Sequence, residues 1–146
     1  MSEATQYDEI ADYIAEFYDK SDCGTEDIDF MLKLIGNRKE LRILEPFCGT
    51  GRILIPLANA GHTIVGMDKS PNMLKRCKEK IAQVPESVRR RITLLQNDVL
   101  EAQWGTGYDM VVLGANCLFE LQTVKQQELC IQRASQSLSS RGNLLC

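Results

Sequence analysis

From Leu41 onward, short apolar runs alternate along the chain with segments whose apolar residues recur at helical spacing. Strands that alternate with helices of this length favour right-handed βαβ units and a mostly parallel sheet. The helical segments span residues 52–61, 71–84 and 124–140. The predicted strands begin near Arg42, Thr63, Ile92, Asp109 and Asn143. The pattern therefore predicts an α/β fold with a doubly wound, mostly parallel sheet of about five strands.

The amino-terminal segment has no strand pattern and predicts two helices instead. In the first, apolar and tyrosine side chains recur three or four residues apart, which is the spacing of an amphipathic helix. The second follows Thr25, a helix N-cap signal, and Gly36 would end it. We therefore expect a single domain over residues 1–146, with a helical cap over residues 1–37 and the α/β core over residues 38–146.

Charge is distributed unevenly along the chain. The 146 residues are 44% hydrophobic and 25% charged, a balance typical of one globular domain that buries a core. Residues 1–30 hold ten of the 20 acidic side chains but only one base, Lys20. An acidic amino-terminal segment repels phosphates and argues against a nucleic-acid partner. The basic clusters at residues 75–80 and 89–91 are typical of a solvated helix face and its exit loop.

The six cysteines form no CxxC pair, and the single histidine, His62, lies near none of them in the sequence. This spacing argues against a zinc site, and we expect no bound metal. Several cysteines lie in apolar segments, which favours reduced and buried thiols. No apolar run approaches the roughly 18 residues that span a bilayer, and the first residues lack the layout of a signal peptide. We expect a cytoplasmic protein without a membrane partner.

Glycines cluster where the first predicted strand ends and the next helix begins, in the sequence EPFCGTGR over residues 45–52. In a doubly wound sheet, ligands bind beyond the carboxyl ends of the strands. Glycines at this place let the backbone approach a nucleotide, because they have no Cβ. A glycine-rich turn alone is weak evidence for a nucleotide site, so a second feature is needed.

Asp68 supplies the second feature. It closes the second predicted strand, 17 residues after Gly51. A carboxylate at this position can accept hydrogen bonds from both ribose hydroxyls of an adenosine. The alternative is that Asp68 serves only as a cap for the helix that starts near Ser70 and Pro71.

Polar residues also follow the third and fourth predicted strands. After the third strand come Asn97, Asp98 and Val99, where a polar side chain could reach an adenine amine and Val99 could cover a ring face. Asn116 follows the fourth strand. Because the carboxyl ends of parallel strands open onto one edge of the sheet, we expect both segments to line the same crevice as the glycine turn.

Four segments resemble the successive motifs of class I S-adenosylmethionine (SAM) dependent methyltransferases, particularly those that act on small molecules. They are LEPFCGTGRILIPLANAG, VGMDKSPNMLKRCKEK, LLQNDV and YDMVVLGANCLFEL, and the resemblance covers about residues 40–146. It implies a Rossmann-like fold, SAM as the cofactor, and methyl transfer to a small-molecule acceptor that the sequence does not identify.

The resemblance also implies which residues bind the cofactor. Glu45 would orient the methionine part of SAM, and Asp68 would hold the ribose. The other positions that the resemblance implies are Cys48, Gly49 and Gly51 beside the methionine part, Lys69 and Met73 beside the adenosine, and Asp98 and Val99 at the adenine. From their places at the turn and the strand ends we add the candidates Phe47, Asn97 and Asn116.

The sequence departs from the family pattern at Phe47, which stands where the first glycine usually does, although Gly49 and Gly51 keep the turn. EPFCGTG is also similar to the DPFCGSG-like loop of nucleic-acid amino-methyltransferases. Those enzymes place an Asn-Pro-Pro-Tyr type motif after the fourth strand to hold a flipped base, and GANCLFEL stands here instead. A nicotinamide-dependent oxidoreductase would need its third glycine at Leu54. Both alternatives are therefore disfavoured.

The sequence offers no catalytic triad, and we assign no catalytic residue. None is required, because methyl transfer depends mainly on the alignment of a nucleophile and the exclusion of water. If a general base exists, the candidates are Glu120, Tyr7 and Tyr18. His62 lies in a turn before the second strand and is expected to be structural.

The resemblance implies a further strand hairpin beside the fifth strand, and the chain ends before it. We therefore expect a truncated domain in which the fifth strand is an apolar edge, and such edges tend to pair with another chain. A homodimer through this edge, or a hairpin from another polypeptide, would cover it. The alternative to an enzyme is a fragment that binds SAM without catalysis or serves a structural role.

Overall fold

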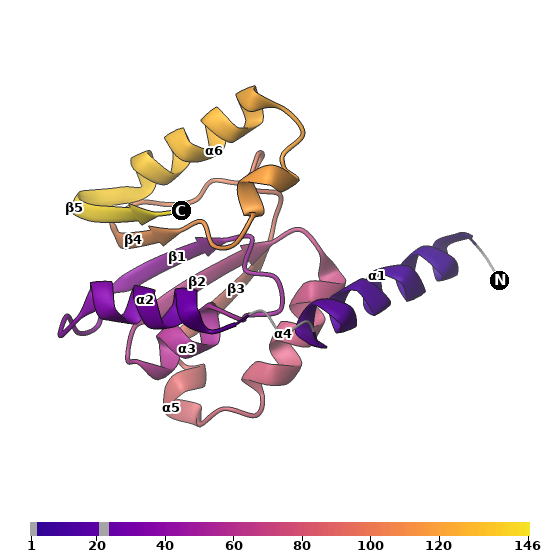
Figure 1. Ribbon diagram of the computed structural model, residues 1–146, viewed down its shortest axis with the longest axis horizontal. Helices are drawn as coiled ribbons and strands as arrows, with labels where there is room; N and C mark the ends of the chain where they lie inside the picture. Colours follow the sequence, from indigo (N-terminus) through magenta and orange to yellow (C-terminus); the bar gives the residue numbers. More distant parts are fainter. Residues whose placement is uncertain (1–2, 21–23) are drawn as a thin grey trace.

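A sheet of five parallel strands forms the centre of the fold (Figure 1). The computed structural model describes residues 3–20 and 24–146, and no side chain for residues 3–9 and 18. The strands are β1 (Arg42–Pro46), β2 (Thr63–Asp68), β3 (Ile92–Gln96), β4 (Tyr108–Val112) and β5 (Leu138–Leu145). Their order in the sheet is β3-β2-β1-β4-β5, so the direction of winding reverses between β1 and β4. The predicted α/β fold with a doubly wound parallel sheet is confirmed.

Helices cover both faces of this sheet. They are α1 (Glu3–Lys20), α2 (Glu26–Ile35), α3 (Leu54–Asn59), α4 (Pro71–Ile81), α5 (Glu86–Arg89), the 3-10 helix η1 (Cys117–Glu120) and α6 (Val124–Ser137). Figure 1 shows α6 on one side of the sheet and α2 and α3 on the other. The two predicted amino-terminal helices and the three predicted core helices are confirmed, whereas the short α5 and η1 were not predicted.

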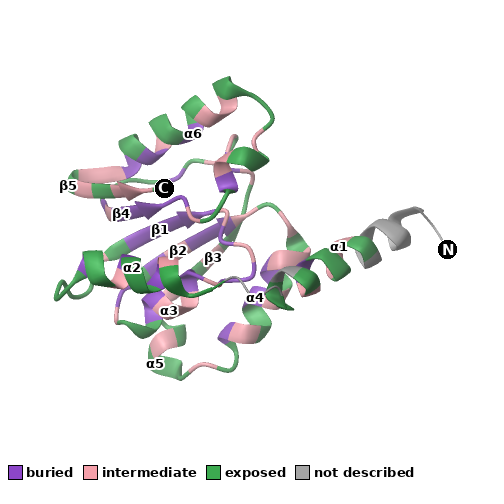
Figure 2. Cartoon of the chain, viewed as in Figure 1, coloured by how far each residue is buried: buried purple, intermediate pink, exposed green. Residues whose placement is uncertain are grey.

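Successive residues of β1 show how both faces are buried. Ile43 belongs to the apolar cluster that includes Leu54 of α3, and Leu44 belongs to the cluster that includes Cys130 and Ala134 of α6. Figure 2 shows the buried residues concentrated in the central strands. Parallel strands that are covered on both faces bury most of their side chains, and in this strand only Arg42 is exposed. The carboxyl end of β1 is therefore held firmly at the point where a ligand site is expected.

The predicted start of the fifth strand was wrong by several residues. It was expected near Asn143, but β5 begins at Leu138, directly after α6 ends at Ser137. Leu138 has extended backbone angles and pairs with Tyr108, and the register shifts before Asn143 pairs with Met110. The polar run between these positions resembles the end of a helix in the sequence, so only the pairing with β4 identifies it as a strand.

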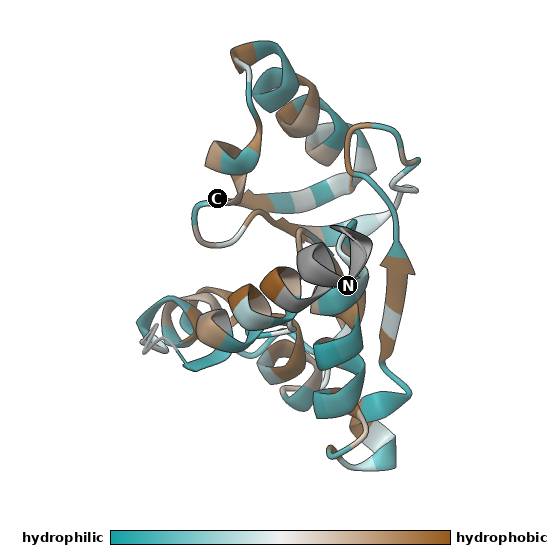
Figure 3. Ribbon diagram, turned by 90° about the vertical axis from the view of Figure 1, so that its right-hand side faces the viewer, coloured by the Kyte–Doolittle hydropathy of each residue, from teal (hydrophilic) through white to brown (hydrophobic). Residues whose placement is uncertain are grey.

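The acidic amino-terminal helices form ion pairs with the core. Asp19 of α1 lies 2.9 Å from the Lys80 ammonium of α4 and 2.5 Å from the Thr50 hydroxyl in the glycine turn. Asp27 of α2 binds the Arg52 guanidinium through two bonds of 2.7 and 2.9 Å. Figure 3, which views the side where α1 projects, also shows apolar residues on this helix. Part of the acidic charge near the amino terminus therefore neutralises bases around the glycine turn.

The cysteines described as buried are free thiols. They are Cys48, Cys77, Cys117 and Cys130, while Cys146 is free and exposed and Cys23 lies outside the described residues. Burial raises the pKa of Cys130 to about 11 and that of Cys77 to about 12, so both thiols stay protonated near neutral pH. No helix in the described ranges has the length and apolar character needed to cross a membrane.

Candidate functional site

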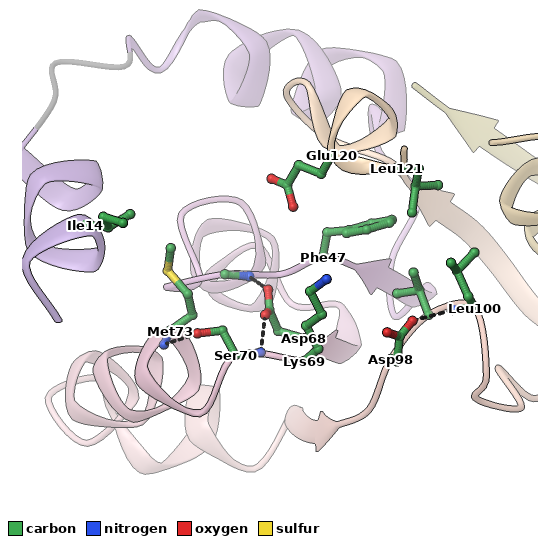
Figure 4. A pocket seen from close by; sticks show the side chains of 12 residues that line it. Ile14, Phe47, Asp68, Lys69, Ser70, Met73, Asp98, Leu100, Glu120 and Leu121 are labelled. Atoms are coloured by element: carbon green, nitrogen blue, oxygen red, sulfur yellow. Dashed lines mark hydrogen bonds between the residues drawn. The ribbon is translucent and has the colours of Figure 1, made fainter. Parts of the chain in front are cut away.

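A pocket of about 300 Å³ opens beyond the carboxyl ends of β1, β2 and β3 (Figure 4). This is the edge of the sheet where doubly wound folds bind ligands. Its lining comes from the glycine turn, the start of α4, the segment after β3, η1 and one residue of α1. The lining residues are Ile14, Phe47, Gly49, Asp68, Lys69, Ser70, Met73, Asp98, Val99, Leu100, Glu120 and Leu121.

The glycine turn forms even though phenylalanine replaces its first glycine. Phe47 adopts a φ of 62°, a left-handed conformation that residues with a Cβ rarely occupy. Gly51 has a φ of 85°, and a Cβ there would lie 2.8 Å from the Cys77 sulfur. Cys48 N–H donates to the Met67 carbonyl at 2.9 Å, which ties the turn to β2. The predicted turn through the two later glycines is confirmed.

Asp68 joins three parts of the site. Its Oδ2 accepts a 2.8 Å hydrogen bond from the Gly49 N–H, and its Oδ1 accepts a 2.8 Å bond from the Ser70 N–H. Ser70 in turn is the N-cap of α4, because its hydroxyl accepts a bond from the Met73 N–H. The helix-cap role considered for Asp68 therefore belongs to Ser70. Each carboxylate oxygen of Asp68 keeps a second lone pair that a ligand hydroxyl can use.

The segment after β3 forms another wall of the pocket. The Asp98 carboxylate accepts a 2.8 Å bond from the Leu100 N–H, which fixes the side chain at the start of the loop. Val99 is buried, and its carbonyl accepts 2.9 Å bonds from the Trp104 indole and the Arg133 guanidinium. Polar and apolar groups are thus held side by side, as contact with a flat heterocycle requires.

Glu45 is a buried carboxylate at the end of β1, just before the turn. Only 4% of the residue is exposed, and its Oε2 has no hydrogen-bond partner among the described residues. Burial raises the pKa of this carboxyl well above its ordinary value, the nearby Arg52 charge opposes the rise, and Asp68 adds to it. A buried acceptor without a partner is costly, and such a group in a native fold calls for an explanation in terms of function.

Glu120 is the acidic residue that η1 contributes to the pocket. In Figure 4 its carboxylate points toward the space that Met73 and Asp68 also face. Burial is the main cause that raises the pKa of Glu120, the Asp68 charge raises it further, and Lys69 lowers it. Glu120, one of the three candidate general bases, therefore lies in the pocket, while the side chains of Tyr7 and Tyr18 lie outside the described residues.

The structure brings together seven of the twelve predicted cofactor-binding residues. Those in the pocket lining are Phe47, Gly49, Asp68, Lys69, Met73, Asp98 and Val99. Those outside the lining are Glu45, Cys48, Gly51, Asn97 and Asn116, and their roles stay predictions. Asn97 and Asn116 are both exposed. His62 is buried, and its Nδ1 accepts a bond from the Leu41 N–H, as a structural residue would.

Four lining residues were not predicted. Ser70 and Leu100 each follow a predicted residue by one or two positions, so the strand-end rule could have included them. Leu121 follows η1, a helix too short to leave a periodic signal. Ile14 belongs to the amphipathic pattern of α1, where an apolar residue is ordinarily interpreted as core. Its place in the pocket depends on how α1 docks against the core.

Comparisons with known proteins agree with this geometry. Residues 43–142 match the family model of a methyltransferase domain. The demethylmenaquinone methyltransferase of Staphylococcus aureus (strain MRSA252) is 30% identical over 120 residues, which cover 80% of this chain and 46% of that protein. This chain thus spans about half the length of that curated relative.

Solved structures show the same fold. The CcbJ methyltransferase from Streptomyces caelestis has a TM-score of 0.79 and 27% identity, over 90% of this chain and 53% of that one. The glycopeptide N-methyltransferase MtfA complexed with SAM has a TM-score of 0.74 and 22% identity, over 83% and 52%. With the matched family model, these findings confirm the resemblance that the motifs predicted: the chain belongs to the methyltransferase domain family, of the class I SAM-dependent type.

Proposed function

We propose that this chain binds SAM in the pocket and that the protein methylates a small-molecule acceptor. The observation that carries the proposal is the pair of hydrogen bonds by which Asp68 joins the glycine turn to the start of α4 at the pocket wall. Asp68 would hold the ribose, and Asp98 with Val99 would contact the adenine. Lys69 and Met73 would flank the adenosine.

Two features of the turn fit such a cofactor. Oε2 of Glu45, just before the turn, has no hydrogen-bond partner among the described residues. The positive charge of the methionine part of SAM would stabilise this carboxylate, either by direct contact or through the residues of the turn. A Cβ built on Gly49 meets no atom within 4 Å, so the backbone faces open space at this pocket position. Cys48 and Gly51 would support the turn from outside the pocket lining, whereas Phe47 is part of that lining.

When bound, SAM supplies an activated methyl group together with its leaving group. The residues of this chain therefore have to position an acceptor and exclude water, which can contribute effective molarities of roughly 10⁵–10⁸ M. The pocket walls formed by Phe47, Leu100 and Leu121 are suited to water exclusion. Glu120, which lines the pocket, would accept a hydrogen bond or a proton from the acceptor.

A methyl-transfer assay tests the activity. The purified chain, or the longer protein that contains it, is incubated with methyl-labelled SAM and pooled metabolites, and label in a small-molecule product is expected. Label on nucleic acid alone would contradict the small-molecule proposal. Binding of SAM without any transfer would favour the non-catalytic alternative. A nicotinamide cofactor is disfavoured because Leu54, at its third glycine position, is fully buried against Gly66.

Glu45→Gln is expected to stabilise the ligand-free protein and to weaken SAM binding. The pKa of Glu45 is raised in the folded state, so its ionisation destabilises the fold as the pH rises above the ordinary value of 4.5. Glutamine is not ionised, so the variant should be more stable than the unmodified protein near neutral pH, and this gain in the free energy of unfolding should shrink as the pH falls toward 4.5. Thermal unfolding across this pH range measures the gain. A variant that is less stable at every pH would contradict this explanation.

The cellular setting and assembly stay proposals. We infer a single SAM-binding domain over residues 1–146, made of the helical cap and the α/β core, with no membrane or nucleic-acid partner. Buried free thiols support a reducing compartment such as the cytoplasm. β5 lies at one end of the sheet, which supports a homodimer through this strand. Sedimentation that finds only monomers at high concentration would contradict the homodimer.

A further inference from the structure

Among the described residues that line the pocket, three are carboxylates, and backbone N–H groups donate hydrogen bonds to two of them. Asp68 accepts two backbone N–H groups, and Asp98 accepts that of Leu100. Glu120, in contrast, has no hydrogen bond or ion pair with any residue in the described part of the chain. Its carboxylate nevertheless points into the pocket (Figure 4). Glu120 is therefore available for a ligand.

The surroundings of Glu120 favour a cation as that ligand. Partial burial and the Asp68 charge both raise the pKa of Glu120, so the charged carboxylate is poorly stabilised. Lys69 is the single base among the described lining residues, and its charge offsets only part of this effect. A bound cation would stabilise the carboxylate more than a neutral group would.

An apolar surface borders the same pocket. On α1, Ile10, Tyr13, Ile14 and Phe17 lie at helical spacing on one face, which we name the α1 stripe. The exposed fractions of these residues run from 50% to 68%, so the stripe has little cover among the described residues. Ile14 lines the pocket, which makes the stripe continuous with the space that Glu120 faces.

We infer that the methyl acceptor is an amine with an apolar body, whose ammonium group binds Glu120 while its body lies on the α1 stripe. Glu120 takes a proton from the ammonium, and the freed nitrogen lone pair forms the new N–C bond to the methyl group as the C–S bond of SAM breaks and S-adenosylhomocysteine leaves. The inference rests on the proposed function, because it assigns the acceptor part of the same pocket. The adenosine contacts are assigned to Asp68 and Asp98, so Glu120 and Ile14 are left to recognise the acceptor. The charge of Glu120 would recognise the ammonium nitrogen, and the apolar α1 stripe would recognise the rest of the acceptor.

Two probes of the same size test the preference for charge. Phenethylamine and phenethyl alcohol share an apolar body and differ in the ammonium group. Each is titrated into protein saturated with S-adenosylhomocysteine, and calorimetry measures its affinity. We expect the amine to bind roughly tenfold or more tightly. Glu120→Gln should abolish this preference, whereas Glu128→Gln, which alters an exposed glutamate on α6, should keep it.

A second variant tests the apolar surface. Replacing both Ile14 and Phe17 with alanine keeps good helix formers on α1 but removes two of the four large apolar side chains of the α1 stripe. The affinity for phenethylamine should fall by roughly fivefold or more, because less apolar surface is buried with the probe. The affinity for S-adenosylhomocysteine should stay within about twofold of the unmodified protein.

Two results would overturn the inference. One is equal affinity of the unmodified protein for the two probes. The other is a Glu120→Gln variant that loses affinity for S-adenosylhomocysteine itself, because the carboxylate would then belong to the cofactor contacts. Titration with S-adenosylhomocysteine alone separates this failure from that of the proposed function. A protein that binds it but ignores the amine leaves the proposed function intact.

Discussion

Asp68→Ala is expected to lower the affinity for SAM by about a hundredfold or more. Each hydrogen bond from a ribose hydroxyl to the carboxylate contributes about 1.5–3 kcal/mol, and alanine removes both. The substitution also removes the acceptor for the Gly49 and Ser70 N–H groups, so the turn loses its link to the start of α4. Calorimetric titration with SAM measures the change.

Asp109→Ala is the matched control for this variant. Asp109 also accepts a backbone N–H, that of Arg42 at 2.9 Å, but it lies near the amino end of β4, away from the pocket. It should therefore affect stability without affecting the affinity for SAM. Asp68→Asn keeps a carbonyl acceptor, so its affinity for SAM should lie between those of Asp68→Ala and Asp109→Ala. If folded Asp68→Ala and Asp109→Ala proteins bound SAM with equal affinity, the assignment of Asp68 to the SAM site would be wrong.

Gly51→Ala is expected to destabilise the fold by about 2–5 kcal/mol and to abolish measurable SAM binding. The left-handed backbone costs about 1–2 kcal/mol for a residue with a Cβ. The new methyl group would also lie 2.8 Å from the Cys77 sulfur and 3.3 Å from Ile55 Cδ1, and overpacking adds about 1–3 kcal/mol. Urea denaturation measures the stability, and titration measures the binding.

Gly61→Ala separates the clash from the backbone strain. Gly61 has a φ of 99°, but a Cβ there meets nothing within 4 Å, and the residue lies outside the pocket lining. The free energy of unfolding of Gly61→Ala should fall by only about 1–2 kcal/mol, and its affinity for SAM should be unchanged. If both variants lost the same stability and bound SAM equally well, the close contact beneath the turn would have no role in the site.

The strand-end residues of the site could be predicted because their place follows from topology. Parallel strands open onto one edge of the sheet, so identifying where β1, β2 and β3 end was enough to bring Gly49, Asp68 and Asp98 together. The limits appear where structure depends on distant partners. The start of β5 at Leu138 depends on pairing with Tyr108, which leaves no signal in the local sequence.

The remaining site residues depend on tertiary contacts. Ile14 reaches the pocket because α1 docks beside α4, with Asp19 bound to Lys80 and to the turn residue Thr50. Sequence periodicity identifies the apolar face of a helix but not what that face covers. The left-handed Phe47 was also beyond prediction, since only the assembled turn shows that a residue with a Cβ adopts the conformation expected of glycine.

The most direct measurement of SAM binding is a calorimetric titration of the purified chain with S-adenosylhomocysteine, the stable product form of the cofactor. We predict one site per chain, lost or strongly weakened in Asp68→Ala and kept in Asp109→Ala. A chain that is folded by circular dichroism and yet takes up no ligand at millimolar concentration would contradict the assignment of this pocket to SAM.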